Sequence, residues 1–263
     1  MNLQLDGKIA LVTGASQGLG YALALALSRE GARVAINSRN LEKLQNSAAK
    51  IRAETGNEVI ALAADVTEPA AAGTIVNEVV NAFGGLDLLV ANAGGPPAGS
   101  FETFTDEDWE RAVNLSFLSQ VRLIRAALPH LRQSSAAAVL TVTSVSVKQP
   151  LINLVLSNSV RLATIGLTKS LALELGHQGI RFNSILPGWT ETDRVLQLME
   201  HRSKASGLSI EEEKQKQAKE SPLGRMATPE EFANVGVFLL SPAASYLTGV
   251  MLSVDGGMYK GTF

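Results

Sequence analysis

Residues 13–20 of the chain read TGASQGLG and directly follow a short apolar run at 9–12. A helical pattern begins inside the same stretch, so a strand, a glycine-rich turn and a helix are expected in that order. Glycine lets the backbone approach a ligand closely, and a helix N-terminus offers unpaired N–H groups and a positive dipole end. The stretch therefore predicts a cradle for a nucleotide pyrophosphate; a purely steric need for glycine is the alternative.

The rest of the chain alternates short apolar runs with longer helical patterns. The runs predict strands at 9–12, 34–37, 59–63, 86–91, 137–143, 181–186 and 250–254. Helical patterns lie near 19–30, 40–55, 68–83, 106–132, 154–176 and 229–240. Continuously apolar runs are typical of parallel strands that are covered on both faces. We therefore expect one α/β domain over residues 1–263, a Rossmann-type doubly wound sheet of about seven parallel strands with helices on both faces.

Composition narrows the functional classes. The 263 residues are 46% hydrophobic and 18% charged, with a net charge of −2, which gives no general attraction to nucleic acid or an anionic membrane. The absence of cysteine excludes disulfides, thiolate metal sites and cysteine nucleophiles, and we predict no metal site. The sequence shows neither a signal-peptide pattern nor an apolar segment long enough to span a bilayer, so we expect a soluble cytoplasmic protein.

The charged segment 194–220 interrupts the alternation of strands and helices and has Gly207 near its middle. One interpretation is a solvated surface helix. The other is a mobile substrate lid, because the segment directly follows a loop expected to contact the cofactor.

Further short segments follow the predicted strands in a fixed order. They are Asp65-Val66 after the third strand, Asn92-Ala93-Gly94 after the fourth, Asn114 in the next helix, Ser144 after the fifth strand, Asn183 with Pro187-Gly188 and Thr192, and 252–257 near the C-terminus. With the spacing T-G-x-x-x-G-x-G at 13–20, they resemble the short-chain dehydrogenase/reductase family, and within it the 3-oxoacyl-[acyl carrier protein] reductases. The resemblance covers nearly the whole chain.

The resemblance implies a nicotinamide cofactor, a small carbonyl or alcohol substrate, and a homo-oligomer, a tetramer or dimer, formed through the helices at 106–132 and 154–176. It places Asn114 and Ser144 in the active site. It assigns cofactor binding to Gly14, Ser16, Gln17, Gly18, Leu19, Gly20, Ser38, Arg39, Asp65, Val66, Asn92, Ala93, Gly94, Arg161, Pro187, Gly188 and Thr192.

The end of the second predicted strand bears on which nicotinamide is bound. An acidic residue there would accept hydrogen bonds from the adenosine 2′-hydroxyl and favour NAD. Ser38 occupies this position and is followed by Arg39, whose guanidinium can grip a phosphate. An exposed loop arginine is the alternative, and Gln17 stands where many NADP-dependent relatives carry a basic residue. We predict NADP(H).

The expected proton donor is absent. Members of the family carry a catalytic tyrosine 13 residues after the serine and a lysine four residues later, but here these positions hold Ser157 and Arg161. The spacing of four places both side chains on one helix face. A serine hydroxyl is a far weaker acid than a phenol, whose pKa is about 10. Arginine can hold ribose hydroxyls but does not shuttle a proton.

Lys148, four residues after Ser144, is a candidate substitute donor, because that stretch lines the substrate cleft in relatives. A surface lysine at a strand end is the alternative. We therefore include Ser144, Ser157, Arg161, Asn114 and Lys148 as the candidate catalytic residues.

Two functions remain open at this point. The favoured one is an NADP(H)-dependent oxidoreductase that transfers a hydride between the nicotinamide and a ketone or secondary alcohol, such as a 3-oxoacyl thioester, with an atypical proton relay. The alternative is an NADP(H)-binding homologue without dehydrogenase activity that acts as a binding or regulatory protein. A different reaction in the same cleft, such as dehydration, is the least favoured.

Overall fold

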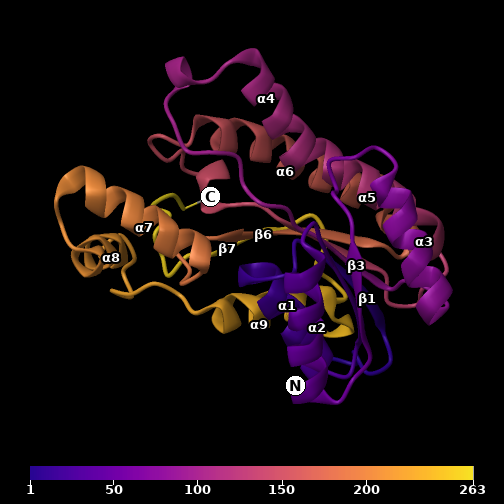
Figure 1. Cartoon of the computed structure of the whole chain (residues 1–263). Coiled ribbons are helices and arrows are strands. Elements are labelled where there is room, and N and C mark those ends of the chain that lie inside the picture. The colour runs from indigo at the N-terminus through magenta and orange to yellow at the C-terminus, as the bar shows by residue number, and fades with distance from the viewer. Residues whose placement is uncertain (263) are drawn as a thin grey trace.

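The computed structural model describes residues 1–262, except for the side chains of residues 201 and 205. Its centre is a seven-stranded parallel sheet in the order β3-β2-β1-β4-β5-β6-β7 (Figure 1). The strands are β1 (Ile9–Thr13), β2 (Arg33–Ser38), β3 (Val59–Ala63), β4 (Leu88–Ala91), β5 (Ala138–Val142), β6 (Arg181–Pro187) and β7 (Met251–Val254). The predicted doubly wound sheet is confirmed.

Two apolar layers enclose the sheet. One face is covered by α1 (Gly18–Arg29), α2 (Leu41–Thr55) and α9 (Pro229–Leu240), the other by α3 (Ala71–Phe83), α5 (Ser119–Leu131) and α6 (Val155–Leu175). Leu23 of α1 and Phe232 of α9 are fully buried in the first layer, and Ile75 of α3 and Leu123 of α5 in the second. Both faces are therefore covered, as the continuously apolar strands predict.

The chain order reverses between β1 and β4. From β1 the chain winds outward through β2 to β3, and then returns to add β4 on the other side of β1. The carboxyl ends of β1 and β4 therefore flank the crevice in which open parallel sheets bind ligands. Thr13 and Ala91 are the last residues of these two strands.

The helix predicted at 106–132 is present without a break, but it is not α-helical throughout. It consists of α4 (Asp106–Val113), a π-helical turn at Asn114–Leu118, and α5. A π-helical turn adds a residue to the helix and re-aims the side chains around it. Thr105 and Thr228 cap the helices that follow them, and each forms a capping box, with Asp108 and Glu231 respectively.

The segment at 194–220 forms two short helices, α7 (Asp193–Ser206) and α8 (Ile210–Ala218), separated at Gly207, which has a φ of +76°. They stand apart from the two helical layers, beside the ends of β6 and β7 (Figure 1). A β-bridge between Thr190 and Ala227 closes the base of this excursion. Within residues 1–262, no helix combines the length and apolarity needed to cross a membrane.

Candidate active site

The glycine-rich turn after β1 is shaped by close backbone contacts. Gly14 and Gly18 both have a φ of +60°, and a Cβ on Gly20 would lie 2.3 Å from the carbonyl oxygen of Gly14. Helix α1 begins at Gly18, and the side chain of its N-cap residue, Gln17, makes no capping hydrogen bond. The N–H groups of the first turn are thus left for a ligand, as in pyrophosphate cradles.

Thr13 and Asn92 connect the ends of β1 and β4. The Thr13 hydroxyl donates to the Asn92 carbonyl at 2.7 Å, and the Asn92 amide N–H donates back to the same hydroxyl at 3.0 Å. The Asn92 side chain also donates to the carbonyls of Thr13 and Gly14, at 3.1 and 3.2 Å. These contacts fix the position of the glycine turn relative to the neighbouring strand.

The end of β2 places a hydroxyl beside an exposed cation. The Ser38 hydroxyl is buried and has no hydrogen-bond partner among the described residues. The Arg39 side chain is 78% exposed, and its Nη1 lies 3.8 Å from Oδ2 of Asp65, a loose ion pair. The other carboxylate oxygen of Asp65 accepts hydrogen bonds from the N–H and hydroxyl of Thr67. Arg39 is therefore available to an added phosphate.

A cleft of about 630 Å³ runs from the glycine turn to the end of β5. It brings together most of the residues predicted to bind the cofactor or substrate: Gly14, Gln17, Gly18, Leu19, Gly20, Asn92, Ala93, Gly94, Ser144, Ser157, Arg161, Pro187, Gly188 and Thr192. Ser16, Ser38, Arg39, Asp65 and Val66 lie outside its lining. Three of those five, Ser38, Arg39 and Asp65, meet at the ends of β2 and β3, where an adenosine would extend beyond the cleft.

Ser144 and Ser157 reach the cleft from different elements. Ser144 follows β5, and its Oγ accepts a hydrogen bond from the N–H of Ser146 at 3.1 Å, so its own hydroxyl proton can point into the cleft. Ser157 lies in the first turn of α6 and is 8% exposed. Because both hydroxyls line the same cleft, both can donate to a ligand oxygen.

Arg161 is held in a fixed orientation and is only 9% exposed. Its Nε donates to Ser157 Oγ at 3.2 Å, and its Nη1 donates to the carbonyls of Val142 and Thr143, both at 3.1 Å. Burial and the nearby charge of Arg194 lower the pKa of Arg161 to about 10. The side chain is therefore still cationic at neutral pH.

Arg194, at the start of α7, spans the mouth of the cleft. It donates from Nη1 to the Gly95 carbonyl at 3.0 Å and from Nη2 to the Pro96 carbonyl at 3.1 Å. A Cβ on Gly95 would lie 2.8 Å from Nη2 of Arg194 and 3.2 Å from Nη2 of Arg161. Partial burial lowers the pKa of Arg194. Two guanidinium groups thus converge on Gly95, and neither forms a salt bridge among the described residues.

The loop after β6 faces the glycine turn. A Cβ on Gly18 would lie 3.7 Å from Cγ2 of Thr192, so the two segments approach each other across the cleft. The Thr190 hydroxyl is buried without a partner among the described residues. The loop after β6 and the open first turn of α1 therefore face each other where a bound dinucleotide would lie.

The comparisons with known proteins agree with this geometry. A family model described as enoyl-(acyl carrier protein) reductase matches residues 14–259. The 7alpha-hydroxysteroid dehydrogenase of Escherichia coli K12 is 30% identical over 256 residues, which are 97% of this chain and 96% of that protein. The chain belongs to the short-chain dehydrogenase/reductase family.

Two solved structures of this family extend the comparison. L-sorbose reductase from Gluconobacter frateurii, complexed with NADPH and L-sorbose, has a TM-score of 0.95 and 33% identity, covering 99% of this chain and all of that one. An NADPH-bound short chain oxidoreductase from Pseudomonas aeruginosa PAO1, described as containing an atypical catalytic center, has a TM-score of 0.90 and 30% identity, covering 98% and 99%. These relatives show that the chain is an oxidoreductase of the short-chain dehydrogenase/reductase type.

Two of the candidate catalytic residues in the present protein, Asn114 and Lys148, lie outside the lining of the cleft. The Asn114 side chain donates to the Thr67 carbonyl at 3.1 Å and accepts from Nη1 of Arg122 at 2.6 Å. The Lys148 ammonium lies 5.3 Å from the centre of the Tyr259 ring, because the 3-10 turn at Val145–Val147 redirects the chain after Ser144. The structure therefore groups Ser144, Ser157 and Arg161 and places Lys148 beside the C-terminal segment.

Three residues of this site are not predicted from the sequence. Thr13 begins the glycine motif but also links β1 to Asn92, and Trp189 and Arg194 both line the cleft. The proximity of Trp189 to Pro187-Gly188 was a usable signal. No local pattern could reveal that Arg194 reaches the loop after β4.

Proposed function

We propose that the protein is an NADP(H)-dependent oxidoreductase that transfers a hydride between the nicotinamide and a ketone or secondary alcohol. The proton relay is atypical, with Ser157 and Arg161 in the places of the family's tyrosine and lysine. The observation that carries this proposal is the Arg161–Ser157 hydrogen bond within the cleft, four residues apart on α6. Arg161 and Ser157 are both polar and are held in place by this hydrogen bond, whereas a site that has lost its function would more often carry apolar replacements.

The preference for NADP(H) over NAD(H) rests on the end of β2. Ser38 brings no negative charge against a 2′-phosphate, and the exposed Arg39 can pair with one. The NADPH complexes of the sorbose reductase and the Pseudomonas oxidoreductase support the same choice. The glycine turn would hold the pyrophosphate, and Asn92-Ala93-Gly94 with Thr190 and Thr192 would hold the nicotinamide half.

Each polar residue of the cleft has a separate task. When bound, the nicotinamide supplies or accepts the hydride. Ser144 donates a hydrogen bond to the substrate oxygen, and the guanidinium of Arg161 adds positive potential where negative charge develops on that oxygen. Ser157 accepts the Nε–H of Arg161, so its own hydroxyl proton is free to point to the substrate or to a water. The proton reaches the alkoxide through these hydroxyls from solvent.

The rate expected from this arrangement is modest. General acid–base catalysis contributes roughly 10²–10⁴-fold, and a serine hydroxyl supplies only part of it. Two other contributions to the rate are retained: the positioning of the two reactants and the electrostatic stabilisation of the transition state. The Pseudomonas relative, described as containing an atypical catalytic center, supports the view that the family tolerates a changed catalytic center.

The test is NADPH oxidation by the purified protein with a panel of ketones and 3-oxoacyl thioesters. We expect turnover that Ser144→Ala and Arg161→Met lower by about 100-fold or more and that Lys148→Ala leaves largely intact. Loss of turnover in Lys148→Ala would instead make that lysine the proton donor. Tight NADPH binding without reduction of any carbonyl would favour the alternative, a binding or regulatory protein.

We also propose that the protein forms a homo-oligomer through α4, α5 and α6, which lie side by side on one face (Figure 1). Leu162 and Leu173 of α6 are 53% and 75% exposed, and a partner helix would cover them. Light scattering should give a dimer or tetramer, and Leu173→Glu should reduce it to a smaller species.

A further inference from the structure

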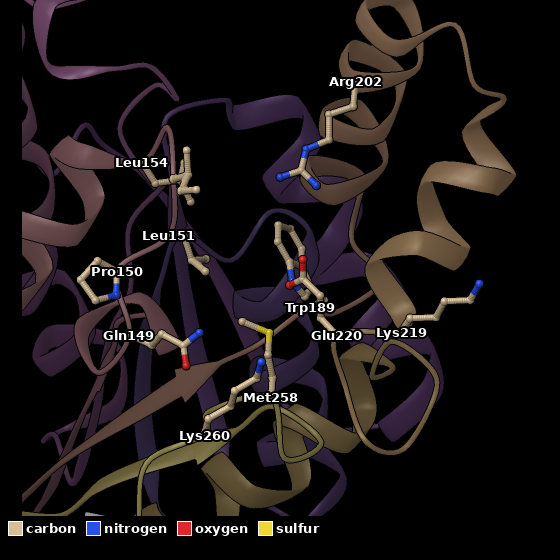
Figure 2. Close-up of a pocket in the computed structure, with 11 residues that line it drawn as sticks. Gln149, Pro150, Leu151, Leu154, Trp189, Arg202, Lys219, Glu220, Met258 and Lys260 are labelled. Atoms are coloured by element: carbon tan, nitrogen blue, oxygen red, sulfur yellow. The ribbon is translucent and has the colours of Figure 1, made fainter.

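A second cavity, of about 590 Å³, opens beside the cleft (Figure 2). We call it the outer chamber. It shares Leu151, Leu154 and Trp189 with the cleft, so these three side chains form a common wall. The two cavities therefore adjoin at these side chains, where a substrate with its carbonyl near Ser144 would enter the outer chamber.

The outer chamber is positively charged. Its lining includes Arg202, Lys219 and Lys260 but only one carboxylate, that of Glu220. Glu220 accepts a hydrogen bond from Nε1 of Trp189 at 3.0 Å, which directs it to the wall. The protein as a whole has a net charge of −2, so this excess of cations runs against its overall charge. A local positive excess in a concave site attracts anions.

Arg202 is positioned before any ligand arrives. Its guanidinium carbon lies 5.3 Å from the centre of the Trp189 ring, and its Nη1 donates to Oε1 of the buried Gln217. Figure 2 shows this guanidinium above the chamber, with Lys260 entering from the opposite side and Lys219 extending away. Because its orientation is already fixed, Arg202 loses little side-chain entropy on binding an anion.

Apolar side chains also line the outer chamber. Leu151 and Leu154 belong to the shared wall, and Met258 lies next to Lys260 in the lining of the chamber. The complementary ligand has a carbonyl at one end, an apolar middle and a negative charge at the other end. The carboxylate of Glu220 makes a singly charged group more suitable than a dianionic phosphate.

We propose that the outer chamber binds the non-reacting end of the substrate and that this end carries a carboxylate, attracted by the positive charges of Arg202 and Lys260 on opposite sides of the chamber. The inference rests on the proposed function, because it names the substrate class of the same enzyme: oxo acids rather than neutral ketones.

The test compares methyl-ketone acids of increasing chain length, from acetoacetate upward, each with its own methyl ester and with NADPH as reductant. At the chain length that fits, kcat/KM for the acid should exceed that for the ester by about tenfold. Arg202→Gln and Lys260→Gln should each lower this acid-to-ester ratio by about tenfold. Arg202→Lys, which keeps the charge, should lower it less. The control Lys204→Gln, on the same helix but outside the chamber, should leave the ratio unchanged.

A ratio near one at every chain length, or a ratio that Lys260→Gln does not change, would overturn the proposal. A second experiment tests the carboxylate site independently of the proposed function. It compares, by calorimetry in the presence of NADPH, the binding affinities of hexanoate and of neutral hexanamide. If no ketone is reduced, the proposed function fails. Tighter binding of hexanoate, lost in Lys260→Gln, would still support an anion site, whereas equal binding of the two would overturn it.

Discussion

Nε of Arg161 donates a hydrogen bond to Oγ of Ser157 at 3.2 Å, one helical turn apart on α6. The same guanidinium reaches two backbone carbonyls at the end of β5. Arg161→Lys keeps the charge but cannot make all of these bonds, because an ammonium lacks the planar fork of donors. We expect kcat/KM to fall by about tenfold in Arg161→Lys and by about 100-fold or more in Arg161→Met. Steady-state kinetics check this, with Arg125→Met as an exposed control; equal losses in both Arg161 variants would contradict it.

The lowered pKa of Arg161, about 10, should set the upper pH limit of activity if the proposed role of its charge is correct. The guanidinium is protonated below this pKa, so activity that depends on its charge should persist from neutral pH and fall as pH rises through about 10. In Arg161→Lys the fall should begin at lower pH, because burial also lowers the pKa of a lysine from its usual value of about 10.4. Rate profiles of both proteins, with circular dichroism to confirm that they stay folded, provide the measurement. Superimposable profiles would contradict a role for the charge.

Gly20 tolerates no side chain. A Cβ there would lie 2.3 Å from the Gly14 carbonyl oxygen, so Gly20→Ala must distort the glycine turn. We expect the dissociation constant for NADPH to rise by about 100-fold or more. The matched control is Gly73→Ala in α3, where a Cβ meets nothing within 4 Å and should stabilise the helix by roughly 0.5–1 kcal/mol. Fluorescence titration and thermal unfolding distinguish the two effects.

Arg39 should determine the choice of cofactor. Arg39→Ala removes an exposed cation, and Ser38→Asp introduces a carboxylate that can accept from a ribose 2′-hydroxyl. We expect the double variant to lose at least about tenfold in NADPH affinity and to gain in NADH affinity. If the affinities for both cofactors were unchanged, the 2′-phosphate would not be bound by Ser38 and Arg39.

Glu231 should make the thermal stability of the protein depend on pH in the acidic range. The ion pair with Arg225 and the capping contacts with Thr228 lower its pKa from 4.5 to about 2. The folded state therefore favours the carboxylate, and this stabilisation is present above pH 4.5 and is lost as pH falls to about 2. Glu231→Gln should lower Tm at neutral pH, with a difference from the wild type that shrinks below pH 4.5. A constant difference at every pH would contradict this.

The sequence allowed the strands to be placed within one or two residues because buried parallel strands leave continuous apolar runs between turn residues. The π-helical turn at Asn114–Leu118 could not be predicted, since it arises from a shift in hydrogen bonding inside a stretch with no glycine or proline.

The sequence predicts the positions of those candidate site residues that belong to local motifs. The glycine turn and Asn92 lie as expected because adjacent parallel strands bring their carboxyl ends together. The direction of Lys148 depends on a short turn and on Tyr259, and the position of Arg194 depends on a loop nearly a hundred residues away. Such contacts exist only after the chain has folded, so sequence spacing does not encode them.

The Thr13–Asn92 contacts fix one side of the cleft. On the other side, α7 and α8 stand outside the helical layers, and the β-bridge between Thr190 and Ala227 joins the two ends of the segment that contains them. Arg194 links the two sides, because it reaches from α7 to the Gly95 and Pro96 carbonyls. We expect substitutions elsewhere in α7 and α8 to redirect the enzyme to a new substrate during evolution while the cofactor half of the site keeps its affinity.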